Sequence, residues 1–270
     1  MKIGIWPGCV FVMTRLVMRF PHFLFMLLLS VTLAACSSAN RLLKARPAGL
    51  SPFFEQPSLA QDARGHLPFQ VVWTTPDPRV LAESTTRKKL HVAPVTLAYL
   101  RPVSKALASR EIAWGVHRQE AAVATRLREE FVAAFRRSPQ ARYKIVDKPG
   151  ADTLTLRLAV IELSPTSPKG NAIMTLLKFA VTPAAVLGRW FTKGNMAIEG
   201  KVVDSRTGRV FFQFADHESD KLTFLNTRDY QPYGHAVNSM RDWAVQFEQM
   251  TRTPSGLRIK DSSSITLRPN

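Results

Sequence analysis

The chain has 270 residues, enough for one sizeable domain and a tether, and its 37 Lys and Arg against 20 Asp and Glu give a formal net charge of +17. Residues 1–35 contain three of the basic residues and no acidic residue, which leaves +14 on the rest. Both cysteines, Cys9 and Cys36, fall in the first 36 residues, so residues 37–270 offer none for a disulfide, a nucleophile or a thiolate zinc site.

Residues 1–36 have the pattern of a bacterial lipoprotein export signal. Three basic residues are followed by an apolar stretch over residues 20–33, and Leu33-Ala34-Ala35 stands directly before Cys36. This lipobox pattern predicts that residues 1–35 are removed and that Cys36 becomes a diacylglyceryl and palmitate carrier. The alternative is a transmembrane anchor, which the short apolar stretch disfavours.

Ser37 bears on which membrane the protein would reach. An Asp after the lipidated cysteine would resemble the inner-membrane retention signal, so Ser37 predicts the outer membrane, facing the periplasm. Three acyl chains exceed the two needed for stable anchoring. An exported basic protein meets anionic lipid headgroups, glycans and acidic proteins rather than nucleic acid, so no nucleic-acid partner is expected.

Residues 36–68 read as a lipidated N-terminus and flexible tether. Four prolines interrupt any regular element in this stretch: Pro47, Pro52, Pro57 and Pro68. Phe53 and Phe54 leave two alternatives, a clamp docked on the domain or an exposed apolar site in a disordered arm. We expect the folded domain over residues 69–250.

The first half of that domain contains a strand and a long helix. Residues 90–99 have an apolar rhythm broken by Pro94, which suggests an edge strand or a bulge. Residues 117–137 predict a helix that ends at Ser138-Pro139. Its apolar residues recur every four positions: Val123, Leu127, Phe131 and Phe135.

The second half predicts further strands and a second helix. Residues 143–145 begin a strand, and period-two leucines over 153–160 place one strand face in the core. Residues 196–204 and 209–216 form a hairpin with Gly208 in its turn. Strict alternation puts Phe211 on the opposite face from Phe212 and Phe214.

A last helix over residues 233–250 completes the pattern. Its apolar stripe consists of Val237, Met240, Ala244 and Phe247. Residues 251–270 read as a loose polar tail. The whole order predicts an α+β fold, a single mostly antiparallel sheet with two amphipathic helices on one face.

Four segments resemble a family of bacterial envelope lipoproteins, the domain of unknown function 3313. They are Phe69-Gln70-Val71-Val72-Trp73 with Pro76-Asp77, Leu90-His91-Val92-Ala93-Pro94-Val95, Ala151-Asp152-Thr153-Leu154-Thr155-Leu156-Arg157, and the hairpin from Ala197-Ile198-Glu199-Gly200 to Thr207-Gly208. The resemblance implies a lipoprotein with a sheet-and-helix domain, and it supplies no activity and no catalytic residues. The Gly-rich run common before that hairpin is replaced here by residues 172–191.

No catalytic or metal motif emerges from the titratable residues. No two His residues have a zinc-binding spacing. Asp216-His217-Glu218 allows a metal or acid–base cluster, although a polar strand end is the simpler interpretation. Glu199 and Asp204 suggest paired carboxylates, but residues five apart on a strand face opposite ways and Asp204 suits a turn.

The apolar segment over residues 172–191 has two interpretations, a buried connecting helix or a docking flap. Lys178, Pro183 and Arg189 argue against a simple membrane span. As a flap, it would present Leu176, Leu177, Phe179 and Trp190 to a membrane or partner.

These observations predict a non-enzymatic outer-membrane lipoprotein, a scaffold or accessory protein that binds another envelope component and needs no cofactor or metal. The alternative is a hydrolase or transferase that acts on peptidoglycan or lipid.

Overall fold

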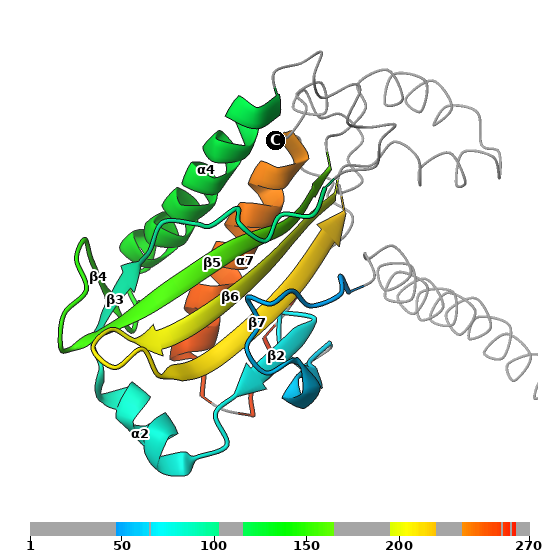
Figure 1. Ribbon diagram of the computed structural model, residues 1–270. Helices are drawn as coiled ribbons and strands as arrows, with labels where there is room; N and C mark the ends of the chain where they lie inside the picture. The colour runs from blue at the N-terminus through cyan, green and yellow to red at the C-terminus, as the bar shows by residue number, and fades with distance from the viewer. Residues whose placement is uncertain are drawn as a thin grey trace, which may run out of the picture. The chain divides into compact units, whose positions relative to one another are not determined.

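The computed structural model describes residues 47–64, 66–102, 116–164, 195–219, 234–254, 256–259 and 261–262, which belong to one compact unit. The strands are β1 (Gln61–Asp62), β2 (Val71–Thr74), β3 (Lys89–Val92), β4 (Lys144–Val146), β5 (Thr153–Ser164), β6 (Asn195–Asp204) and β7 (Val210–Ser219). The helices are α2 (Pro78–Thr86), α4 (Val116–Arg137) and α7 (Gly234–Arg252), with a 3-10 turn, η1 (Pro57–Leu59). The predicted α+β class is confirmed, with α2 as an unpredicted third helix (Figure 1).

One seven-stranded sheet has the order β1-β2-β7-β6-β5-β3-β4. The pairs β1–β2, β2–β7, β7–β6 and β6–β5 are antiparallel, while β3 pairs in parallel with β5 and with β4. The predicted hairpin is confirmed as β6 and β7, and Gly208 has a φ of 73° that favours glycine in its turn. The sheet is therefore mostly antiparallel, as predicted, with a parallel side that the sequence did not reveal.

Pro94 fits the bulge alternative and not the edge-strand alternative. Val92 is opposite Leu156 and Thr96 is opposite Ala159, so four steps along this segment match three along β5. β3 lies inside the sheet and ends at Val92, so the proline follows the strand and removes no ladder hydrogen bond. Beyond it the chain continues along β5, where the Thr96 N–H donates to the Leu158 carbonyl at 3.0 Å.

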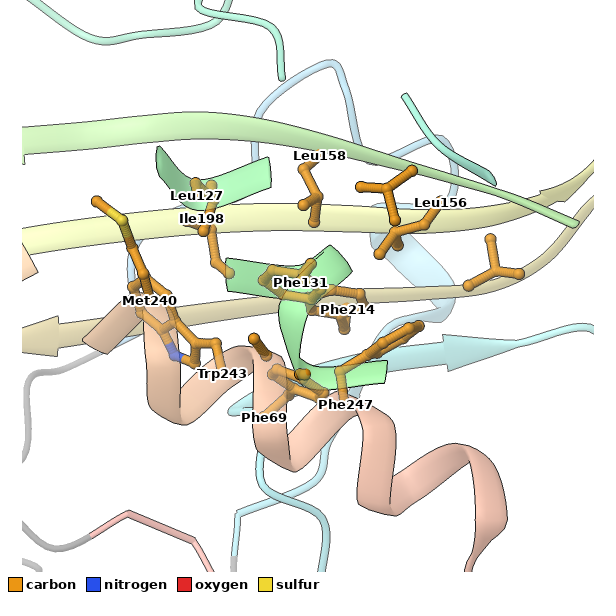
Figure 2. Close-up of a cluster of buried hydrophobic side chains, with 14 of the residues drawn as sticks. Phe69, Leu127, Phe131, Leu156, Leu158, Ile198, Phe214, Met240, Trp243 and Phe247 are labelled. Atoms are coloured by element: carbon orange, nitrogen blue, oxygen red, sulfur yellow. The ribbon is translucent and has the colours of Figure 1, made fainter. Parts of the chain in front are cut away.

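The main core joins α4, α7 and alternate residues of the strands. Leu127 and Phe131 of α4 are 0% exposed, as the four-residue spacing predicts. The buried strand and α7 partners include Leu154, Leu156, Leu158, Ile198, Phe214, Met240, Trp243, Ala244 and Phe247 (Figure 2). Val237 is only half-buried, and Trp243 fills the position on α7 that the predicted stripe omitted.

Phe211 corrects the strict alternation expected for β7. Val202 pairs with Phe212 and Val203 pairs with Val210, so Phe211 is the additional residue of a β-bulge. A bulge turns one extra side chain relative to the regular pleat. Phe211 therefore joins the same buried cluster as Phe214 instead of pointing to the opposite face.

Residues 47–56 pack on the domain, which corrects the flexible tether expected up to residue 68. We call this segment the strap. Phe53 is buried with Ala159, Ile161 and Ala197, and Phe54 is buried in a separate small cluster that includes Trp73. The strap supplies apolar cover to strand residues that alternate with those of the main core. The clamp alternative for the two phenylalanines is the one observed.

Part of the predicted loose tail also packs on the domain. The Ile259 side chain is buried, and its N–H donates to the His66 carbonyl at 3.3 Å. The Ser262 hydroxyl donates to Glu218 at 2.9 Å. The buried Ile259 side chain and these hydrogen bonds attach the segment to the domain, and the polar composition of the stretch does not indicate them.

Candidate functional site

A polar cluster, buried except for Glu55, joins the strap to the central strands. The Glu199 carboxylate accepts two hydrogen bonds from Ser51, one from its N–H and one from its hydroxyl, each at 2.7 Å. Lys201 Nζ lies 2.5 Å from the Glu55 carboxylate and 4.5 Å from the centre of the Phe53 ring. We call Ser51, Glu55, Glu199 and Lys201 the strap cluster.

Burial acts on the pKa of the Glu199 carboxyl. It raises the pKa of Glu199, while the two bonds from Ser51 and the charges of Arg101 and Lys201 act in the opposite direction. A raised carboxyl pKa is a property of many catalytic acids. The Glu199 side chain is however covered by Ser51 and only 2% exposed, so the arrangement fixes the strap instead of receiving a substrate.

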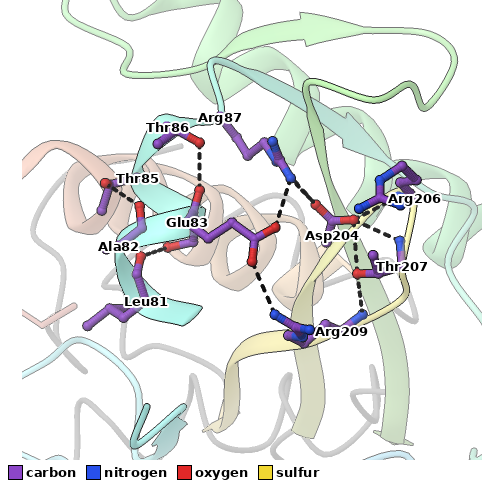
Figure 3. Close-up of polar contacts among 11 residues, drawn as sticks. Leu81, Ala82, Glu83, Thr85, Thr86, Arg87, Asp204, Arg206, Thr207 and Arg209 are labelled. Carbon is purple, nitrogen blue, oxygen red and sulfur yellow. Dashed lines mark hydrogen bonds and ion pairs between the residues drawn. The ribbon is translucent and has the colours of Figure 1, made fainter. Parts of the chain in front are cut away.

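Asp204 organises the β6–β7 turn and does not pair with Glu199 (Figure 3). One carboxylate oxygen accepts the N–H groups of Arg206 and Thr207, and the other lies 2.8 Å from Arg87 Nη2. Burial acts to raise the pKa of Asp204, but the bonds from Thr207, Arg87 and Arg206 outweigh it and lower the pKa to about 2. The predicted turn role fits this geometry, and a catalytic carboxylate pair does not.

The Asp216-His217-Glu218 triplet is divided between two surroundings. Asp216 accepts a hydrogen bond from Trp243 Nε1 at 2.5 Å in the main core, whereas His217 Nε2 lies 3.8 Å from Glu162. Within the described ranges, no three His, Cys, Asp or Glu side chains are grouped to hold a metal ion. The triplet therefore behaves as polar strand residues and not as one chemical centre.

A groove of about 460 Å³ lies between α4 and the edge strand β4. Its lining residues are Val92, Arg128, Glu129, Val132, Ala133, Arg136, Arg137, Ile145, Val146 and Asp147. We call it the α4–β4 groove. Arg128 Nε donates to the Val92 carbonyl at 2.9 Å, and Arg136 lies 3.6 Å from Asp147. The groove therefore has an apolar floor and a rim of three arginines and two carboxylates, which leaves an excess of positive charge for an anionic, partly apolar ligand.

Arg137 is the most available cation of this rim. Its side chain is exposed, and no hydrogen bond or ion pair joins its guanidinium to another described residue. Arg136 is also exposed, at 61%, and its partner Asp147 is 90% exposed, so water screens their pairing. Both arginines therefore remain free to meet an external anion.

The residues that the sequence singled out for anchoring and docking lie outside the described residues. These are Cys36, Ser37, Leu176, Leu177, Phe179 and Trp190. Sequence reasoning missed the strap cluster and the α4–β4 groove. One signal was available, since Glu199 and Lys201 alternate with apolar residues on a strand that is otherwise buried, which indicates polar cover on one side.

In the part of the chain that the structure describes, no helix has the length and apolar character needed to cross a membrane.

The sequence model of a family described as "Protein of unknown function (DUF3313)" matches residues 53–247. A comparison with curated proteins found no match. The chain also has distant similarity to solved structures, among them these two. A PelC dodecamer from Paraburkholderia phytofirmans has 10% identity and a TM-score of 0.34, covering 66% of this chain and 96% of that chain. The hypothetical protein CT253 from Chlamydia trachomatis has 11% identity and a TM-score of 0.31, covering 62% and 95%.

Proposed function

We propose that the chain, which belongs to the DUF3313 family of proteins of unknown function, is a non-enzymatic outer-membrane lipoprotein, because its residues 33–36 have the lipobox pattern. In this proposal Cys36 carries the lipid, Ser37 directs the protein to the outer membrane, and the domain faces the periplasm. It serves as a scaffold or accessory protein that binds another component of the envelope.

The observation that carries the binding role is the α4–β4 groove. It combines an apolar floor with exposed arginines on a rigid helix and an edge strand, which are properties of a recognition surface. The strap supports the anchoring part of the proposal, because it attaches the segment that follows Cys36 to the middle of the sheet. Force or motion at the lipid would then be coupled to the domain.

A hydrolase or transferase acting on peptidoglycan or lipid is the competing function. Its best candidate residue is Glu199, whose pKa is raised by burial. That carboxylate is capped by both the N–H and the hydroxyl of Ser51, so a substrate does not reach it in this conformation. The geometry therefore favours binding over catalysis.

The experiment that tests the proposal compares the natural chain with Cys36→Ala in cells. We expect metabolic palmitate labelling and outer-membrane fractionation for the natural chain, and neither for Cys36→Ala. Ser37→Asp is the matched variant for sorting, and it should keep the label but move the protein to the inner membrane. Palmitate-free natural protein, or Cys36→Ala that stays in the outer-membrane fraction, would contradict the proposal.

A further inference from the structure

We propose that the corner of the domain beside the α4–β4 groove docks on an anionic lipid surface, an inference that rests on the proposed lipid anchoring. Residues 88–89 and 136–148 form this basic corner. It holds seven exposed cations, Lys88, Lys89, Arg136, Arg137, Arg142, Lys144 and Lys148, and a single acidic residue, Asp147. With the neighbouring Glu129 and Asp152 included, its net charge is +4.

The fold brings these cations together from distant parts of the chain. Lys89 is paired with Lys144 in the parallel ladder, and the Lys144 N–H donates to the Lys88 carbonyl at 2.9 Å. Arg136 reaches Asp147 at 3.6 Å, which joins the end of α4 to the residue after β4. One continuous surface therefore carries the charges of β3, β4 and the last turn of α4.

Part of this charge has a structural explanation. Arginines in the last turn stabilise a helix dipole, which accounts for Arg136 and Arg137 on α4. Arg142 donates to the carbonyls of Thr85 and Thr251, each at 3.3 Å. These roles do not account for the lysines of the corner. Three of them are exposed and form no ion pair with any described residue: Lys88, Lys144 and Lys148.

The chemistry of the corner favours a membrane over an extended peptide. A peptide would bind by adding a strand to β4, but β4 has three residues and an exposed Lys144, features that protect an edge from pairing. Dispersed lysines act as separate point charges that suit many headgroups at once. The half-buried Val132, Ala133 and Ile145 of the groove offer apolar contact just beneath that charge.

The proposed lipid at Cys36 would keep this corner close to the membrane. Pro47, where the described strap begins, is eleven residues after Cys36, and an extended chain of that length spans at most about 40 Å. Weak headgroup contacts then act at the high effective concentration of a tethered ligand. Attraction to an anionic surface falls off within a Debye length, so docking must depend on salt.

The test uses the acylated protein in nanodiscs, with an environment-sensitive dye on Ala133→Cys in the groove. We expect a blue shift on discs containing phosphatidylglycerol at low salt, no shift on pure phosphatidylcholine discs, and loss of the shift in about 0.5 M salt. Arg137→Glu combined with Lys144→Glu should lower the ratio of docked to undocked protein at least tenfold.

The matched control, Arg79→Glu with Arg258→Glu, makes the same change in net charge at exposed residues outside the basic corner. It should keep the shift, and equal melting temperatures should show that both double variants fold. The inference would be overturned by equal dye shifts on phosphatidylglycerol and phosphatidylcholine discs, or by an equal loss of the shift in the two double variants. Neither result would bear on the lipid anchor. A photocrosslink from position 133 to an envelope protein, without any lipid-dependent shift, would also overturn it.

Failure of the proposed function has a different signature. A chain that is not acylated would not be retained by the nanodiscs through a lipid. The same dye-labelled protein is then added to phosphatidylglycerol vesicles. A salt-sensitive shift there supports the basic corner as a lipid-binding surface, and its absence overturns that surface as well.

Discussion

The two faces of the central strands are built from alternate residues of the same strands, and they are stabilised in different ways. On one face, the side chains of Leu156, Leu158 and Ile198 lie in a continuous apolar core with α4 and α7. On the other, Glu199 and Lys201 bind the strap through hydrogen bonds and an ion pair. We call these the helix face and the strap face. Apolar burial stabilises the first, and specific polar contacts with small apolar clusters stabilise the second.

The difference predicts an uneven distribution of stability. The helix face contains a chain of aromatic contacts in which the ring centres of Phe69 and Phe214 are 4.2 Å apart, and those of Phe214 and Phe247 are 5.4 Å apart. The strap is a single short segment without a helix or strand of its own. We therefore expect the strap to open locally at a lower free energy than the sheet unfolds.

The largest effect is expected for Leu156→Asp on the helix face. An unpaired charge in this core should destabilise the domain by more than about 4 kcal/mol, enough to unfold it. Thr155, its neighbour on the strap face, is also buried and lies 2.7 Å from the Ser205 hydroxyl. Thr155→Val loses that hydrogen bond and should cost about 1 kcal/mol in urea denaturation. Equal costs would refute the assignment of faces.

A smaller effect on the same face is expected at Gly200. A Cβ atom added there would meet the ring of Phe214, so the aromatic side chain covers a position that only glycine leaves open. Gly200→Ala should destabilise the domain by about 1–3 kcal/mol through overpacking. Combining it with Phe214→Leu should cost less than the sum of the two single changes. Strict additivity in a double-mutant cycle would show that the contact is unimportant.

On the strap face, Ser51→Ala should act mainly on local opening. It removes the hydroxyl that donates to the buried Glu199 carboxylate, at a cost of about 1–2 kcal/mol. Limited proteolysis should then cleave within residues 47–56 faster, while the unfolding midpoint of the sheet moves little. Ser58→Ala, at an exposed position, is the control. If Ser51→Ala lowered the free energy of global unfolding as much as the free energy of strap opening, the two faces would unfold together.

The smallest effect is a pH slope carried by Glu199. Because its pKa is raised above the ordinary value of 4.5, the folded state keeps the proton longer than the unfolded state. The contribution of Glu199 to stability is therefore complete below pH 4.5 and is lost as the pH rises through the raised pKa. Glu199→Gln should remove that decline, seen as a change of a few degrees in how Tm varies with pH. If Glu199→Gln left the dependence of Tm on pH unchanged, the assignment of this pH slope to Glu199 would be wrong.

The helix face was largely predictable because its information is local. The spacing of Leu127 and Phe131, and the alternation of Leu154 with Leu156, identify a helix and a strand face directly. Phe211 was placed wrongly because a bulge is set by the register between two strands, which periodicity in one strand does not contain. For Pro94 the sequence left an edge strand and a bulge open, and only the pairing with β5 distinguishes them.

The strap face and the basic corner depend on contacts between distant residues. Ser51 and Glu199 are 148 positions apart, so no local pattern links them. The cations from Arg136 to Lys148 are visible as a charged stretch, but Lys88 and Lys89 join them only through parallel pairing of β3 with β4. The anchor at Cys36 and the segment around Leu177 stay predictions, because both lie outside the described residues.

The position of the strap also determines how the domain would respond to mechanical tension. Its bonds end on β6 and β7, and β6 is the middle strand of seven, held by neighbours on both sides. A pull from an anchored N-terminus would be applied first to the Gly49 carbonyl, which accepts from Arg101, then to Ser51 and then to Glu55, one contact after another. The strap would peel away at low force before any strand left the sheet. Each contact released would lengthen the tether by a few residues, so the domain could yield to envelope strain and stay folded.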